Sequence, residues 1–137
     1  MNVEEALAAT PLLASVDKKT IKRLADQGKH RHYDTGETIV KEGSPASAFY
    51  IILSGKVHFE RSDTDTRLGS AGPGDFFGEL ALIEEHPRSA TIVADEPTDC
   101  LLFVAWEFTA LLKEHPQMAM VLLMAMIRIL HRREHAK

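Results

Sequence analysis

Cysteine, surplus positive charge and long apolar runs are all scarce in this chain of 137 residues. Its single cysteine, Cys100, excludes an internal disulfide framework and a cysteine-based metal cluster. The formal net charge of −4 disfavours a general nucleic-acid surface, which needs a basic excess. The longest apolar run, 118–127, is too short to cross a bilayer. We therefore expect one globular domain over residues 1–137.

The amino terminus lacks the positively charged segment that opens a secretory signal peptide. Its first residues, Met1 to Glu5, are acidic at their end instead. Together with the scarcity of cysteine, this pattern predicts a cytoplasmic protein that does not enter a membrane.

Glycine is absent after Gly78, and all eight glycines lie between Gly28 and that residue. Tight turns are therefore concentrated in the middle of the chain. Short strands are predicted there at 37–42, 48–53, 56–61, 90–94 and 100–105. Many short strands with glycine and proline turns favour an antiparallel roll.

Helices are predicted on both sides of this roll. In the segment 1–28, one helix covers 3–9, and a second is capped by Ser15 and ends at Gly28. The segment 106–135 is predicted to hold two helices that are separated near Pro116. The last helix, 117–134, is apolar on nearly every face, so one face is expected to pack on the roll and another on a further partner.

The segment 74–91 holds the residues with the clearest chemistry. Gly74 permits a sharp turn, and Gly78 lets backbone approach a ligand without an intervening Cβ. A short helix that begins over 79–82 would direct free N–H groups at an anion. Arg88 can add a charge-assisted hydrogen bond to a phosphate oxygen. The segment therefore predicts a site for a small sugar phosphate, with Glu79 accepting from sugar hydroxyls.

The run FGELALIEEHPRSATIVA resembles the phosphate-binding cassette of the cyclic nucleotide-binding domain family. The run YDTGETIVKEGSPASAFYIILSGKVHF is similar to the early strands of that family, and the likeness extends over about 10–134. The family includes regulatory subunits of cAMP-dependent kinase, catabolite activator proteins and nucleotide-gated channels. It implies an α+β fold: an eight-stranded antiparallel β-roll (a double-stranded β-helix or jelly-roll) over 31–105, with N-terminal helices and two C-terminal helices.

The resemblance also assigns roles to residues. Glu79 would bind the ribose 2′-hydroxyl, and Arg88 would pair with the cyclic phosphate. The implied ligand-binding residues are Phe77, Gly78, Glu79, Leu80, Ala81, Arg88, Ser89 and Ala90. A serine after the arginine resembles bacterial cAMP receptors, so the implied ligand is cAMP, with cGMP as the alternative.

Two departures from the family pattern qualify this resemblance. Several members cap the base with an aromatic residue of the C-terminal helix, but no aromatic residue follows Phe108 here. The base would therefore be covered by aliphatic groups, by methionines or by the polar end of the helix, where Arg128, His131 and Arg132 are the candidate lid. Catabolite activator proteins continue into a helix-turn-helix domain, whereas this sequence ends at Lys137, so we expect no direct DNA binding by this chain.

The expected function is that of a sensor whose C-terminal helix moves when the nucleotide binds. The apolar side of helix 117–134, around Val121, Met124 and Leu130, would be the output surface, for a homodimer or a partner domain. The alternative is a ligand-silent structural or interaction module of the same fold. Arg88→Ala separates the two, because only the sensor loses a ligand.

Other motifs carry less weight, and none indicates an enzyme or a cofactor. His131 and His135 have zinc-ligand spacing, but Arg132 replaces the glutamate of the metalloprotease motif and no third ligand is evident. The glycines of 72–78 nearly match a dinucleotide fingerprint, but one spacing is a residue too long. No nucleophile elbow or hydrolase triad is present in the sequence.

Overall fold

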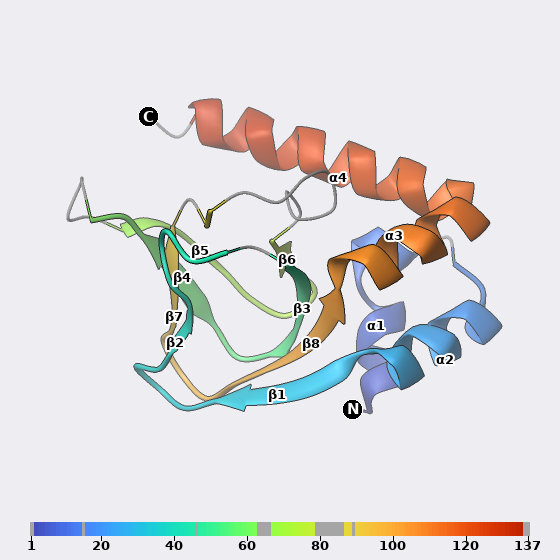
Figure 1. Ribbon diagram of the computed structural model, residues 1–137, viewed down its shortest axis with the longest axis horizontal. Helices are drawn as coiled ribbons and strands as arrows, with labels where there is room; N and C mark the ends of the chain where they lie inside the picture. The colour runs from blue at the N-terminus through green and yellow to red at the C-terminus, as the bar shows by residue number, and fades with distance from the viewer. Residues whose placement is uncertain are drawn as a thin grey trace.

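The structure is a computed structural model, which describes residues 2–14, 16–45, 47–62, 67–78, 87–88 and 90–135. Figure 1 shows a β-roll on one side of the molecule and helices from both ends of the chain on the other, from which the last helix (red) extends along the top of the view toward the side of the roll. The chain therefore brings its first and last segments together beside one sheet.

The roll is built from two four-stranded sheets whose neighbouring strands are all antiparallel. One sheet has the order β1-β8-β3-β6 and the other β2-β7-β4-β5. The strands are β1 Lys29–Tyr33, β2 Thr38–Val40, β3 Ala48–Ser54, β4 Val57–Glu60, β5 Arg67–Ala71, β6 Phe76–Phe77, β7 Thr91–Ala94 and β8 Thr98–Val104. The predicted antiparallel roll is thus confirmed.

Strand β3 is buried on both of its sides. Phe49 and Ile51 belong to the apolar cluster that the sheet forms with the helices. Tyr50 and Ile52 belong to a second cluster between the two sheets. Because successive side chains of a strand point to opposite faces, β3 separates these two cores. This explains why 48–53 is a nearly continuous apolar run and does not alternate.

The helices are α1 Val3–Ala8, the 3₁₀ helix η1 Pro11–Leu13, α2 Lys18–Gln27, α3 Ala105–Glu114 and α4 Pro116–His135. Phe49 of β3 stacks on Phe108 of α3, with ring centroids 4.7 Å apart. Leu7 of α1, Leu24 of α2 and Met118 of α4 join the same cluster. Burial of these side chains fixes both ends of the chain on one face of the sheet, at roughly 1.5–3 kcal/mol for each large side chain.

The second N-terminal helix begins later than the sequence predicts. Its cap is Asp17, whose side chain accepts a hydrogen bond from the Thr20 N–H at 2.8 Å. The helix therefore begins two residues later than a cap at Ser15 would place it, and Val16 precedes it. The predicted cap, Ser15, lies outside the described residues. Aspartate caps as well as serine does, so spacing alone does not separate two adjacent candidates.

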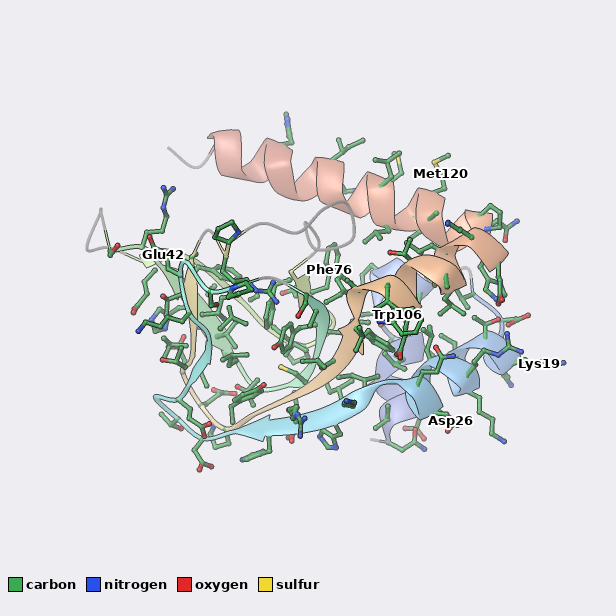
Figure 2. All side chains as sticks on the ribbon, viewed as in Figure 1. Lys19, Asp26, Glu42, Phe76, Trp106 and Met120 are labelled. Carbon is green, nitrogen blue, oxygen red and sulfur yellow. The ribbon has the colours of Figure 1, made fainter. Side chains whose placement is uncertain are left out.

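Helix α4 packs mainly on η1 and α3, and its buried residues join the cluster that these helices form with one face of the sheet. Met118 and Leu122 face this contact and are buried. The opposite face carries an exposed apolar stripe of Met120, Leu123, Met124 and Ile127. Figure 2 shows Met120 pointing away from the rest of the molecule. The predicted output residue Val121 is instead partly buried against the core, and the Leu130 side chain lies outside the described part.

Within the described part of the chain, none of the helices combines the length and the apolar character that a membrane span needs.

Several strand predictions were incomplete. Strand β1 is absent from the predicted strands, because all its residues except Tyr33 are exposed and polar. Strands β5 and β6 were not predicted, and β2 is shorter than the predicted 37–42. A two-residue strand such as β6 is too short for a pattern of alternating burial.

The outer side of β1 carries a cluster of histidine and aspartate. His30 Nε2 and His32 Nδ1 each lie 3.0 Å from Asp99 Oδ1, across the β1–β8 pair. The other ring nitrogen of His32 lies 3.2 Å from Asp34 Oδ1. The hydrogen bond to Asp99, above all, raises the pKa of His32. Burial raises the pKa of Asp99, but hydrogen bonds from His32, Ser54 and His30 lower it by more, so this pKa lies below its usual value.

This cluster predicts a pH-dependent contribution to stability, which Asp99→Asn removes. A raised histidine pKa stabilises the fold fully below its ordinary value of about 6.5, and the effect disappears as pH rises through the folded value. A lowered aspartate pKa stabilises above about 3.9 and loses its effect as pH falls through the folded value. The melting temperatures of wild type and Asp99→Asn should therefore differ most near pH 5. The difference should shrink toward pH 8.5, where the histidines have lost their charge and the hydrogen bond from Ser54 to Asp99 remains. Asp26→Asn, an exposed carboxylate of α2, is the control, and a pH-independent difference for Asp99→Asn would contradict the prediction.

Candidate functional site

The candidate site begins where β6 ends, at Gly78. This residue has φ +84°, in the left-handed region that favours glycine. A Cβ at this position would lie 2.6 Å from the Ala48 carbonyl oxygen and 2.7 Å from Arg88 Nη1. Gly78 therefore permits the turn and also leaves the space in which the arginine lies.

The backbone of Arg88 is fixed by the turn between β2 and β3. The Gly43 N–H donates to the Arg88 carbonyl, and the Arg88 N–H donates to the Ser44 carbonyl, both at 2.8 Å. Pro45 and Pro87 form an isolated antiparallel bridge beside them. Together these contacts pair residues 87–88 with the turn before β3, so the backbone from which the Arg88 side chain extends is fixed.

The guanidinium of Arg88 lies against β3. Its Nη2 donates a hydrogen bond to the Ala48 carbonyl at 3.0 Å, and its Cζ lies 5.7 Å from the centre of the Tyr50 ring. The residue is half-buried. A permanently charged, planar donor group at a partly desolvated position is suited to a phosphate or carboxylate.

Two aromatic rings support this side of the site from within the roll. Tyr50 and Phe77 are partners in the β3–β6 register, and their rings stack with centroids 4.6 Å apart. Tyr50 is 7% exposed and Phe77 is 4% exposed. Burial raises the pKa of Tyr50, against the opposite effect of the Arg88 charge, and it raises the pKa of Tyr33 to about 12. These phenols therefore stay neutral at physiological pH.

The structure brings some of the predicted residues together. Gly78 and the Arg88 guanidinium are adjacent, and Ala90 is half-buried at the start of the strand that follows. The Phe77 side chain points into the roll and does not line an open surface. Glu79, Leu80, Ala81 and Ser89 lie outside the described residues, as does the predicted helical start over 79–82. Their roles remain predictions.

The predicted base lid lies on α4. Arg128 and His131 are exposed, and the side chain of Arg132 lies outside the described part. Their role as a lid also remains a prediction.

The sequence analysis did not identify the groups of β3 that contact the Arg88 guanidinium. The Ala48 carbonyl and the Tyr50 ring both come from β3, which is about 40 residues before Arg88 in the chain. A backbone carbonyl has no sequence signature. The sequence held one indication of this contact, the turn expected at Gly43. That turn leads into β3, and its backbone pairs with Arg88.

Other groups fit a ligand less well. An open depression of about 400 Å³ is lined by Gly55, Lys56, Ser70, Ala71, Gly72, Pro73, Asp75 and Glu96. Its two carboxylates, Asp75 and Glu96, against the single charge of Lys56 do not favour an anion. Cys100 is fully buried, and burial raises the pKa of its thiol to about 12. Among the described residues, no group of His, Cys, Asp or Glu is arranged to hold a metal ion.

Comparison with known proteins gives a consistent result. Residues 30–115 match the family described as the cyclic nucleotide-binding domain. The chain is 40% identical over 91 residues to a cAMP-dependent protein kinase regulatory subunit of Aspergillus fumigatus, an alignment that covers 66% of this chain and 22% of that protein. It is 34% identical over 127 residues to Glutaminase 2 of Bradyrhizobium diazoefficiens, covering 93% of this chain and 20% of that protein. The chain thus spans about a fifth of the length of these curated relatives.

Among solved structures, the catabolite activator protein of Thermus thermophilus superposes with a TM-score of 0.82 and 29% identity. The superposition covers 93% of this chain and 61% of that one.

Proposed function

Because the chain belongs to the cyclic nucleotide-binding domain family, we propose that it is a regulatory module that binds a cyclic nucleotide, with cAMP as the preferred ligand. One observation carries the proposal: the Arg88 guanidinium is held against β3, beside a glycine whose missing side chain keeps the space open. Domains of this family regulate and do not catalyse, so we propose no reaction for residues 1–137, which we treat as one such domain.

The ligand would be held in two parts. Arg88 pairs with the cyclic phosphate, which carries one negative charge. Glu79 accepts a hydrogen bond from the ribose 2′-hydroxyl. Backbone N–H groups near Gly78, Leu80 and Ala90, with the Ser89 hydroxyl, would complete the phosphate cradle. The half-buried position of Arg88 supports this arrangement, because a charge pair is stronger where water is partly excluded.

The preference for cAMP rests on the kinship with a regulatory subunit named for cAMP dependence. The serine after the arginine is consistent with it. A hydroxyl at that position can also serve the amino group of guanine, so cGMP is the competing ligand.

Titration calorimetry with cAMP and cGMP tests the function, with 5′-AMP as a control that has the same base and sugar but an open phosphate. We expect saturable binding of cAMP that exceeds binding of 5′-AMP. Absence of both heat and thermal stabilisation at millimolar cyclic nucleotide would refute the sensor and leave the ligand-silent interaction module as the function.

The output would pass through α4. The nucleotide orders the segment between β6 and β7, and α4 changes its position or its partner in response. A ligand biases such a change only through its different affinities for the two states. Residues Arg128, His131 and Arg132 would contact the base in the closed state.

We propose that the exposed stripe of Met120, Leu123, Met124 and Ile127 pairs with the same stripe of a second copy. The spacing i, i+3, i+4, i+7 forms one apolar seam, which two identical helices can share about a two-fold axis. Nothing in the stripe is charged, so a second copy buries it without leaving an ion unpaired.

Leu123→Glu and Ile127→Glu should therefore shift the protein from dimer to monomer, because each buries a carboxylate in the seam. Sedimentation velocity at several concentrations measures the shift, and Gln117→Glu, an exposed position of the same helix, serves as control. A wild type that is monomeric at all concentrations would contradict the dimer and direct attention to a partner domain.

A further inference from the structure

Tyr50 links the Arg88 guanidinium of the candidate site to the interior of the roll. Its ring faces the Arg88 guanidinium on one side of the fold and stacks on Phe77 within the roll. We propose that Tyr50 is a positioning residue for phosphate binding: its ring holds the Arg88 guanidinium in the orientation that a cyclic phosphate requires. The inference rests on the proposed function and adds a residue that the sequence did not single out.

The geometry supports a direct effect on the arginine. The distance of 5.7 Å from Arg88 Cζ to the Tyr50 ring centre is within the range of a cation–π interaction. Ala48, two residues earlier on the same side of β3, accepts the Nη2 hydrogen bond. The ring and the carbonyl thus contact the guanidinium from a single strand, one through its face and the other through a directed hydrogen bond.

The stacked rings of Tyr50 and Phe77 form a rigid surface. Tyr50 is 7% exposed, and its ring lies at only 12° to that of Phe77. Strand register places these two residues opposite one another, so the backbone as well as the side chain is fixed. An arginine side chain has four rotatable bonds, and their freedom is lost when it binds a ligand. A rigid surface that restricts rotation of the arginine side chain before the ligand binds lowers the conformational entropy that binding costs.

The chemistry of the phenol is consistent with this role. Burial raises the pKa of Tyr50, so its ring remains the neutral, electron-rich surface that a cation contacts. Phenylalanine offers nearly the same face, whereas leucine offers none. The proposal therefore separates the aromatic face of Tyr50 from its hydroxyl.

The test compares Tyr50→Leu, Tyr50→Phe and Phe49→Leu. Phe49 is the neighbouring residue of β3, it is fully buried, and it belongs to the cluster on the helix side of the sheet. Its replacement removes an aromatic ring from the same strand on the face away from Arg88. For each variant, cAMP affinity is measured by calorimetry below its melting temperature, and the Arg88 Nε–Hε resonance is recorded by NMR.

We expect Tyr50→Leu to weaken cAMP binding by about tenfold, from the typical strength of a partly desolvated cation–π contact. Tyr50→Phe and Phe49→Leu should remain within about threefold of wild type. The Arg88 resonance should lose its ring-current shift only in Tyr50→Leu. Equal losses for Tyr50→Leu and Phe49→Leu, or for Tyr50→Leu and Tyr50→Phe, would overturn the inference. A wild type that binds no cyclic nucleotide would instead overturn the proposed function, and the resonance would still report whether the ring lies over Arg88.

Discussion

Arg88→Ala is expected to weaken binding of cAMP by about 30-fold to several-thousand-fold, while the protein remains folded. Removing one partner of a half-buried, hydrogen-bonded charge pair costs ~2–5 kcal/mol of binding free energy, because the other charge is left without its counter-ion. The fold should tolerate the change, since the backbone of Arg88 keeps its hydrogen bonds with Gly43 and Ser44. Calorimetry gives the affinity, and thermal melting gives the stability.

Two further variants make this result specific. Arg88→Lys retains the charge but not the planar pair of donors, so its affinity should fall between those of wild type and Arg88→Ala. Arg23→Ala removes an exposed arginine of α2 that pairs with Glu114 at 3.6 Å, and it should leave the affinity unchanged. If Arg23→Ala weakens binding as much as Arg88→Ala does, the effect is one of overall charge and the assigned role of Arg88 is wrong.

Gly78→Ala should both destabilise the protein and impair ligand binding. Alanine at φ +84° costs about 1–2 kcal/mol in backbone strain. Its Cβ would also meet the Ala48 carbonyl and the Arg88 guanidinium at 2.6 and 2.7 Å, so one of them must move. Overpacking of this kind costs a further ~1–3 kcal/mol. Displacement of the arginine should lower cAMP affinity by at least about tenfold, or ~1.4 kcal/mol.

Gly43→Ala is a closely matched control for this variant. Gly43 has φ +85°, so its backbone strain is nearly the same, but nothing lies within 4 Å of an added Cβ. Denaturant unfolding of both variants therefore separates strain from steric overlap. If the two variants lose equal stability and both bind normally, the close approach at Gly78 has no energetic consequence.

The fold was predictable because its main elements have regular patterns. The helical periods at both ends and the glycine-bounded strands between them led to the antiparallel roll. Strand β1 shows why prediction fell short elsewhere: a polar edge strand such as Lys29–Tyr33 gains its structure from pairing with β8, and its own residues give little signal. The packing of α4 on η1 also required knowledge of which segments meet in space.

In the candidate site, the residues that lie close together in the sequence were predictable, and those from a distant strand were not. Gly78 and Arg88 belong to a local segment, and the type and spacing of its residues indicated an anion. Tyr50 and the Ala48 carbonyl contact the Arg88 guanidinium from a distant strand, through a ring face and a backbone oxygen. Such groups become apparent only when the strand register is known.

The two-sided burial of β3 means that ligand binding also reports the fidelity of folding. A slip of one residue in this strand would exchange its faces, and in one direction it would place Ile51 where the Tyr50 ring now lies. Such a misregistered molecule would still bury apolar side chains on both sides and would be hard to detect by its secondary-structure content. It would, however, lack the aromatic surface that Arg88 contacts. Under the proposed function, the fraction of purified protein that binds cAMP would therefore measure how much of it has the native register.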